Sequence, residues 1–142
     1  MRLLLTRNNI FERITPMKNK HFYKITPYLP VIDLKETLAF YRDQLGFSGE
    51  WTAGAPLPVG GIQRDDLRLI FQQHPAYTRM VNTDSESFEL ILFVENVDDI
   101  YREYESKNIR FVSGLVDRPW GIREFIIQDP NGYWLRISEG TL

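Results

Sequence analysis

The chain has 142 residues, of which 43% are hydrophobic and 25% are charged, so it is long enough for one domain with its own core and too short for two. A formal net charge of −2 gives no attraction to nucleic acids or anionic membranes, and we expect partners among small molecules or proteins. The absence of cysteine excludes disulfides, thiolate nucleophiles and cysteine-ligated metal centres.

Residues 1–22 carry several basic side chains and no hydrophobic period, and we interpret them as an N-terminal arm. Because Met17 stands just before the better-organised sequence, residues 1–16 are either a flexible terminus or an extension upstream of a shorter natural start. The start has no small-residue cleavage site, and no run in the chain reaches membrane-spanning length. We therefore expect a cytoplasmic protein.

The first elements expected after the arm are a strand and a helix. The run FYKITPYLPVID is rich in β-forming residues, but its two prolines cannot donate to a ladder, which predicts an edge strand or one that changes partners. Asp33 has the chemistry of a helix cap, with Glu36 as its reciprocal partner. Gly46 ends this helix, whose apolar face is formed by Leu34, Leu38, Tyr41 and Leu45.

The same pattern returns in the second half of the chain. FELILFV predicts a buried strand, and Asn96 predicts a helix cap that stands 63 residues (96 − 33) after Asp33. Each half continues with further strands, so the repeat predicts two βαβββ modules, joined by a linker that begins at His74. Each module alone would expose one face of its sheet, and a ligand is expected in the space between the paired sheets.

The last predicted strand follows a tight turn at residues 129–132, DPNG, which combines proline with residues that tolerate positive φ. In this strand Arg136 falls on the face opposite Leu135 and Ile137. A cation in a largely apolar strand indicates either a solvated side chain or a functional position.

Three phrases in order resemble the vicinal oxygen chelate superfamily, which includes glyoxalase I, extradiol dioxygenases and bleomycin-resistance proteins: TPYLPVIDLKETLAFYRDQLGFSGEW, IQRDDLRLIFQQHP and RPWGIREFIIQDPNGYWLRISE. The chain is most similar to the bleomycin-resistance group. The resemblance implies an α+β fold of two tandem βαβββ modules within residues 23–142, with one module at about 23–78 and the other at about 86–142.

Metal-using members of this superfamily place ligands on the first and last strand of each module. The resemblance puts those positions near Thr26 or Pro27, near Ile70, at Glu89 and at Arg136. Arginine has no lone pair to give, so at most one ligand of three or four remains, and we expect no metal and no cofactor. Instead, Glu89 and Arg136 are predicted to form an ion pair across the cavity.

The other polar residues predict no catalytic set. The two histidines, His21 and His74, are far apart in the sequence and are interpreted as structural or solvated. With histidine this scarce and cysteine absent, no nucleophile and base combination is available. The competing hypothesis is a metal-dependent enzyme of the same superfamily, such as a lyase, isomerase or dioxygenase, with a displaced or substrate-supplied metal.

Aromatic side chains suit the stacking of planar groups and the attraction of cations. The resemblance implies a stacking tryptophan at Trp120, and Trp51 and Phe47 are the next candidates for the cleft. Among acidic residues we select Glu89 and Glu50 as partners for a cationic ligand. Three other strand aromatics are expected in the core, namely Phe71, Phe125 and Trp134.

The resemblance also implies a homodimer in which the first strand crosses to the partner, with Pro30 as the hinge, since its missing N–H favours a strand that leaves its sheet. Together these features predict a non-catalytic protein that sequesters a planar, cationic antibiotic of the bleomycin type. A binder of an unrelated metabolite is the further alternative, because one fold hosts many sites.

Overall fold

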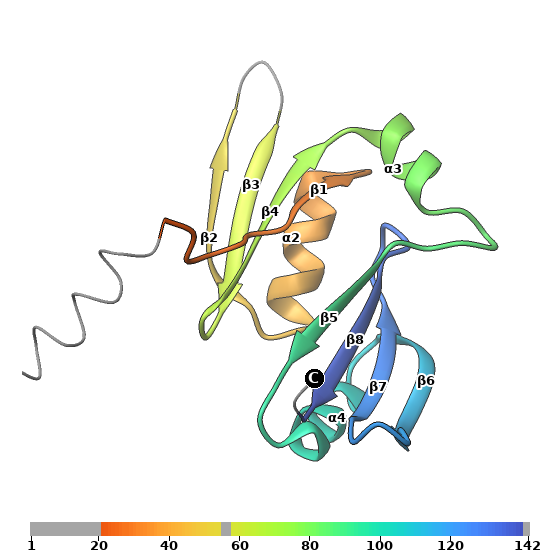
Figure 1. Cartoon of the computed structure of the whole chain (residues 1–142). Helices are drawn as coiled ribbons and strands as arrows, with labels where there is room; N and C mark the ends of the chain where they lie inside the picture. Colours follow the sequence, from red (N-terminus) through yellow and green to blue (C-terminus); the bar gives the residue numbers. More distant parts are fainter. Residues whose placement is uncertain (1–20, 55–57, 141–142) are drawn as a thin grey trace, which may run out of the picture.

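The computed structural model describes residues 21–54 and 58–140, so most of the predicted arm lies outside the described residues. The first module contains β1 (Tyr28–Val31), α2 (Leu34–Asp43), β2 (Ser48–Ala53), β3 (Val59–Arg64) and β4 (Leu67–Gln73). After α3 (Pro75–Val81), the second contains β5 (Glu89–Phe93), α4 (Val97–Glu105), β6 (Arg110–Asp117), β7 (Arg123–Gln128) and β8 (Trp134–Glu139). The predicted α+β fold of two βαβββ modules is confirmed (Figure 1).

Each module forms its own four-stranded sheet, and the two sheets have the same topology. Their strand orders are β1-β4-β3-β2 and β5-β8-β7-β6. The first strand of each module pairs in parallel with the last, and the other pairs are antiparallel. Tyr28 pairs with Ile70 in the first sheet, and Ile91 pairs with Arg136 at the equivalent place in the second sheet. The repeat in the sequence therefore corresponds to a repeat in the structure. Strand β1 is an edge strand, as the two prolines of the run FYKITPYLPVID predicted.

The two long helices begin in different ways. Helix α2 is capped as predicted, because Asp33 Oδ1 accepts a hydrogen bond from the Glu36 N–H at 2.8 Å. Asn96 also stands at the N-cap, but it has a left-handed backbone, with φ of 57°, and its side chain makes no capping bond. Glu139 Oε1 from β8 instead accepts from the Val97 N–H at 2.7 Å. A tertiary contact therefore replaces the local cap that the sequence predicted.

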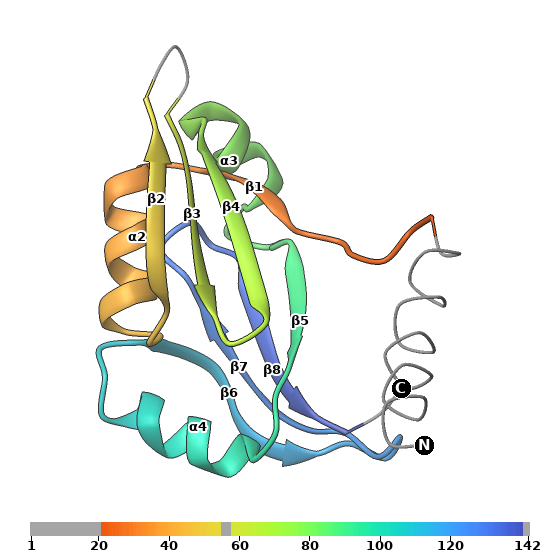
Figure 2. The same ribbon diagram turned by 90° about the vertical axis from the view of Figure 1, so that its left-hand side faces the viewer.

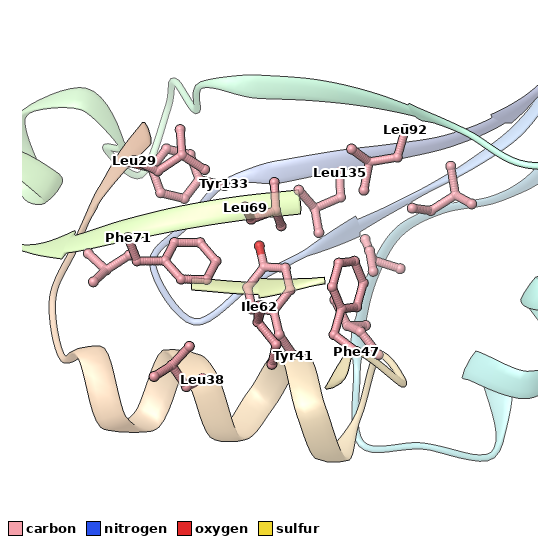
Figure 3. Close-up of a cluster of buried hydrophobic side chains, with 14 of the residues drawn as sticks. Leu29, Leu38, Tyr41, Phe47, Ile62, Leu69, Phe71, Leu92, Tyr133 and Leu135 are labelled. Atoms are coloured by element: carbon pink, nitrogen blue, oxygen red, sulfur yellow. The ribbon is translucent and has the colours of Figure 1, made fainter. Parts of the chain in front are cut away.

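One cluster of buried hydrophobic side chains contains residues of both modules, whose ribbons are shown in Figure 2. Helix α2 packs against the first sheet and α4 against the second. Tyr41 is fully buried and meets the rings of Phe47 and Phe71 in the close-up of Figure 3. Phe71 and Phe125 are both fully buried, which confirms the core positions predicted for them. No helix in the described part of the chain is long and apolar enough to cross a membrane.

The segment expected to be a linker contains a short helix, α3. His74 stands at its N-cap, where Nδ1 accepts from the Tyr77 N–H at 3.2 Å, and Pro75 occupies the first turn. Seven residues are too few to show a helical period in the sequence, so the helix was missed. The structural interpretation of His74 is consistent with this capping bond.

The predicted turn at residues 129–132 is present and also joins the two modules. Asp129 is buried, and its carboxylate accepts hydrogen bonds from the Tyr41 hydroxyl at 2.9 Å, the Asn131 N–H at 2.8 Å and the Tyr133 N–H at 3.0 Å. Asn131 Oδ1 accepts from the Ile32 N–H at 2.8 Å. Because Tyr41 and Ile32 belong to the first module, the turn fixes one module to the other.

Candidate ligand-binding site

The face of the second sheet that turns away from the core carries a row of alternating side chains. Ile91 of β5, Arg136 of β8 and Ile126 of β7 are neighbours in register across three strands. The next row contains Phe93, Ser138 and Glu124. Ile91 and Phe93 are about half exposed although they are large and apolar. An exposed apolar pair of this kind favours contact with a ligand or a partner.

A groove of about 300 Å³ lies on this face. It is lined by Ile91, Phe93, Arg118, Trp120, Ile122, Glu124, Arg136 and Ser138. Trp120 is in the connection between β6 and β7, which is closed by a hydrogen bond from the Arg118 N–H to the Ile122 carbonyl at 2.7 Å. Gly121 has a φ of 87°, which favours glycine there. This connection holds Trp120 beside the groove with 62% of its surface exposed.

The floor of the groove is an ion-pair network centred on Glu124, which is only 4% exposed. Its carboxylate accepts from Arg136 at 2.8 Å, from Arg118 at 3.0 Å and from the Ser138 hydroxyl at 3.1 Å. Arg136 also donates to Glu89 at 2.9 Å. A buried carboxylate is costly unless it is paired and hydrogen-bonded, and here both conditions are met.

The ion pair also fixes the charge of Arg136. The hydrogen bond to Glu89, together with the nearby charges of Glu89 and Glu124, raises the pKa of the Arg136 guanidinium. A group that is held in its protonated form cannot act as a base or as a metal ligand. The arrangement can therefore bind and orient a ligand, whereas Arg136 offers no lone pair for chemistry.

The sequence model of the Glyoxalase/Bleomycin resistance protein/Dioxygenase superfamily matches residues 20–137. The chain belongs to this superfamily. No match was found among curated protein sequences.

Solved structures of the superfamily give the same fold. A bleomycin resistance determinant encoded on the transposon Tn5 is 30% identical, with a TM-score of 0.67, over 85% of this chain and 100% of that one. A bleomycin-binding protein complexed with bleomycin is 28% identical, with a TM-score of 0.65, over 84% and 100% of the two chains. The bleomycin-binding protein of Streptomyces verticillus, complexed with copper(II)-bleomycin, is 21% identical, with a TM-score of 0.68 over 86% and 99%.

Some members of this superfamily use a divalent metal, which the donor atoms of this groove would have to hold. The resemblance puts Arg136 at the position of the last metal ligand, and its donor atoms are bonded to Glu89 and Glu124. Within residues 21–54 and 58–140, no group of three or more His, Cys, Asp or Glu side chains could hold a metal ion. The residues of the groove therefore do not fit a divalent cation.

Three of the side chains that the resemblance selected come together on the second sheet. Arg136 and Trp120 line the groove, and Glu89 is bonded to Arg136. The predicted pair between Glu89 and Arg136 does form, but it joins adjacent strands of one sheet instead of crossing a cavity. The parallel pairing of β5 and β8 explains the difference.

The other three candidates lie elsewhere. Phe47 is buried in the core, where its ring meets Tyr41 edge to face. Glu50 is on the helix-covered side of the first sheet and accepts from Arg42 of α2 at 2.7 Å. Trp51, the next residue along β2, is on the open side of that sheet and is about half exposed. Of these three candidates, Trp51 is therefore the one that lies on the open face of the first sheet.

Sequence reasoning missed the centre of the network, Glu124, and its second arginine, Arg118. A period of two from Arg136 identifies Ser138 and Trp134 as residues of the same face, but Glu124 requires the register of β7 against β8. Trp134 was expected in the core and is instead only partly buried, on the side of the sheet occupied by Arg136. The next residue, Leu135, is the one that is buried in the core.

Proposed function

We propose that the protein is a non-catalytic, metal-independent binding protein that sequesters a planar, cationic antibiotic of the bleomycin type. The observation that carries the proposal is the groove itself: an exposed Trp120 stands beside an Arg136 that is held by two carboxylates. Such a groove offers an aromatic surface and a fixed polar floor, but no activated nucleophile and no metal ligand set.

Stacking on Trp120 supplies the main attraction in this proposal. Planar heteroaromatic groups stack favourably on an indole, and the interaction is stronger when the ligand is cationic. Ile91 and Phe93 add apolar area beside the tryptophan. The similarity to a bleomycin resistance determinant and to a bleomycin-binding protein, at 30% and 28% identity, supports this ligand class.

In this proposal, the attraction of a cationic ligand comes from the net charge of the whole chain more than from the charges in the groove. Inside the groove, two arginines balance Glu89 and Glu124, so the local charge sums to zero. The chain as a whole has a formal net charge of −2, which favours the approach of a cationic ligand. The proposal includes the cytoplasmic location that was predicted from the sequence.

The proposal also includes a homodimer in which β1 crosses to the partner, with Pro30 as the hinge. Strand β1 has four residues and lies at a sheet edge, so few ladder bonds hold it in its own chain. Its first residue, Tyr28, is an exposed aromatic side chain. Sedimentation at micromolar concentration is expected to give the mass of two chains, and a monomer would overturn this part.

Calorimetric titration with bleomycin, metal-free and copper-loaded, tests the binding proposal. Trp120→Ala is expected to weaken binding by about tenfold or more, because one stacking surface is lost. Met80→Ala is the matched control, since Met80 is a large exposed side chain on α3, away from the groove. Equal affinity of Trp120→Ala and the wild type would overturn the proposal, as would stoichiometric metal that survives dialysis of the purified protein.

A further inference from the structure

Two adjacent glycines, Gly60 and Gly61, lie inside β3. Glycine weakens a strand, because it adds no side chain to the packing and loses the most conformational freedom on folding. Two in succession therefore mark places where other groups approach the backbone closely. Because successive residues of a strand face opposite sides, the two glycines serve different neighbours.

Gly60 faces α2, and an added Cβ atom there would lie 2.9 Å from the backbone carbonyl oxygen of Trp51, 3.2 Å from Leu34 and 3.3 Å from Leu38. Gly61 faces the open side of the sheet and lies directly opposite Trp51 in the β2-β3 register. An added Cβ atom there would lie 2.4 Å from Trp51 Nε1, 2.6 Å from Cε2 and 2.8 Å from Cζ2. No real side chain tolerates such distances, so the indole occupies the space of the missing side chain.

We propose that Gly61 is a positioning residue that seats the Trp51 indole on the open face of the first sheet, as a second stacking group for the planar part of the ligand. This inference rests on the proposed function. Trp51 keeps 47% of its surface exposed even though one edge of its ring is lodged against the backbone. A side chain that is oriented before binding loses less entropy when the ligand arrives.

The neighbours of Trp51 indicate which part of a ligand this surface takes. The row that crosses the first sheet through Trp51 and Gly61 continues with Ile70 of β4 and Tyr28 of β1. This row is aromatic at both ends and contains no charged side chain. It therefore suits an uncharged, flat ring system, whereas the charged groups described above line the groove of the second sheet.

A purely structural role would leave ligand binding unchanged. An aromatic ring that covers a cross-strand glycine can stabilise a sheet by itself, without any ligand. Under that alternative, changes at Gly61 and Trp51 affect unfolding but not affinity. The positioning role predicts that affinity falls whenever the indole is displaced, even in a folded protein.

The first measurement needs no ligand. In a chain with Trp120→Phe and Trp134→Phe, Trp51 is the one remaining tryptophan of the three in the sequence. Gly61→Ala is expected to raise the quenching of its fluorescence by acrylamide, because the added methyl group drives the indole outward. Gly114→Ala is the matched strand control: its Cβ would meet only the Tyr101 hydroxyl, at 3.6 Å, and quenching should not change. Unchanged quenching in Gly61→Ala would overturn the inference.

The second measurement is calorimetric titration with metal-free bleomycin in the chain with all three tryptophans. Gly61→Ala is expected to bind about tenfold more weakly, as for the loss of one stacked ring, and Gly114→Ala to bind like the wild type. The double variant Trp51→Ala/Gly61→Ala should match Trp51→Ala alone, because the methyl group fits once the indole is gone.

The outcomes separate this inference from the proposed function. If the wild type binds and Gly61→Ala binds equally well, this inference alone is overturned. If the wild type does not bind bleomycin, the proposed function fails and the ligand part of the inference fails with it. If Gly61→Ala does not fold but the double variant does, the close contact between Gly61 and the indole is established. The stacking role is then tested by Trp51→Ala alone. An affinity of Trp51→Ala for bleomycin equal to that of the wild type would overturn that role.

Discussion

At the scale of single residues, Arg136 has the most informative environment. Its position in the last strand and its pairing with Glu89 could be predicted from the sequence, because both follow from strand alternation and from the resemblance to the superfamily. Its bond to the buried Glu124 could not, since that contact depends on the register of β7 against β8. The structure thus identifies Glu124, whose buried carboxylate needs Arg136 as a partner.

Arg136→Met is expected to lower the free energy of unfolding by about 1–3 kcal/mol, because Glu124 would stay buried with one arginine fewer. Arg118 and Ser138 remain bonded to Glu124 in this variant. The loss in free energy of unfolding is therefore smaller than for a buried carboxylate without any partner. Urea denaturation at neutral pH measures the difference. Arg102→Met is the control, since Arg102 pairs with Asp99 on the exposed surface of α4 and should matter little. Equal effects of the two variants would contradict this reading of the network.

Asp129 gives a pH-dependent prediction. Burial raises the pKa of its carboxyl from 3.8 to about 6, although hydrogen bonds from Tyr41, Asn131 and Tyr133 act in the opposite direction. The folded state then holds the proton more tightly than the unfolded state, so this group's contribution to stability is full below pH 3.8 and is lost as pH rises through about 6. The loss amounts to about 3 kcal/mol.

Asp129→Asn should remove this pH dependence while preserving the turn. The amide oxygen can accept from the two backbone N–H groups, and the amide nitrogen can donate to the Tyr41 hydroxyl. Relative to the wild type, the variant should gain stability between pH 4 and pH 7, as followed by thermal unfolding in a pH series. A constant difference between the two proteins across that range would show that Asp129 does not titrate there.

At the scale of elements, the turn at residues 129–132 was only half predictable. Its residue chemistry identified a tight reversal, and Gly132 does adopt a positive φ of 93°. Its bonds to Ile32, which follows β1, and to Thr37 of α2 join residues about a hundred positions apart in the sequence, and no local pattern can reveal them. Helix α3 was missed for a related reason, because it is short and begins at an unusual cap, His74.

Asn131→Ala should lower the free energy of unfolding by about 1–3 kcal/mol, because it leaves the Ile32 N–H and the Thr37 hydroxyl without their partner from the second module. Asn108→Ala is the matched control, since the side chain of Asn108 is exposed at the end of the loop after α4. Chemical denaturation compares the two. If Asn131→Ala were as stable as Asn108→Ala, the turn would not be a significant link between the modules.

At the scale of the whole molecule, the repeat explains why two sheets form and why each keeps one open face. The sequence predicted this division, because the strand, helix and cap positions recur at a constant interval. It did not assign candidates to faces: Phe47 points into the core, and Glu50 and Trp51 lie on opposite sides of the first sheet. A bulge in β2 between residues 48 and 51 obscures the alternation there.

Above all, we propose that the open faces bind a planar ligand without changing it. The most direct measurement is to incubate the metal-stripped protein with an excess of bleomycin, separate the complex, release the drug by denaturation and determine its mass. We expect the drug to be retained in stoichiometric amount and recovered at its original mass. Recovery of a chemically modified drug, or retention only after a divalent metal is added, would contradict the proposal.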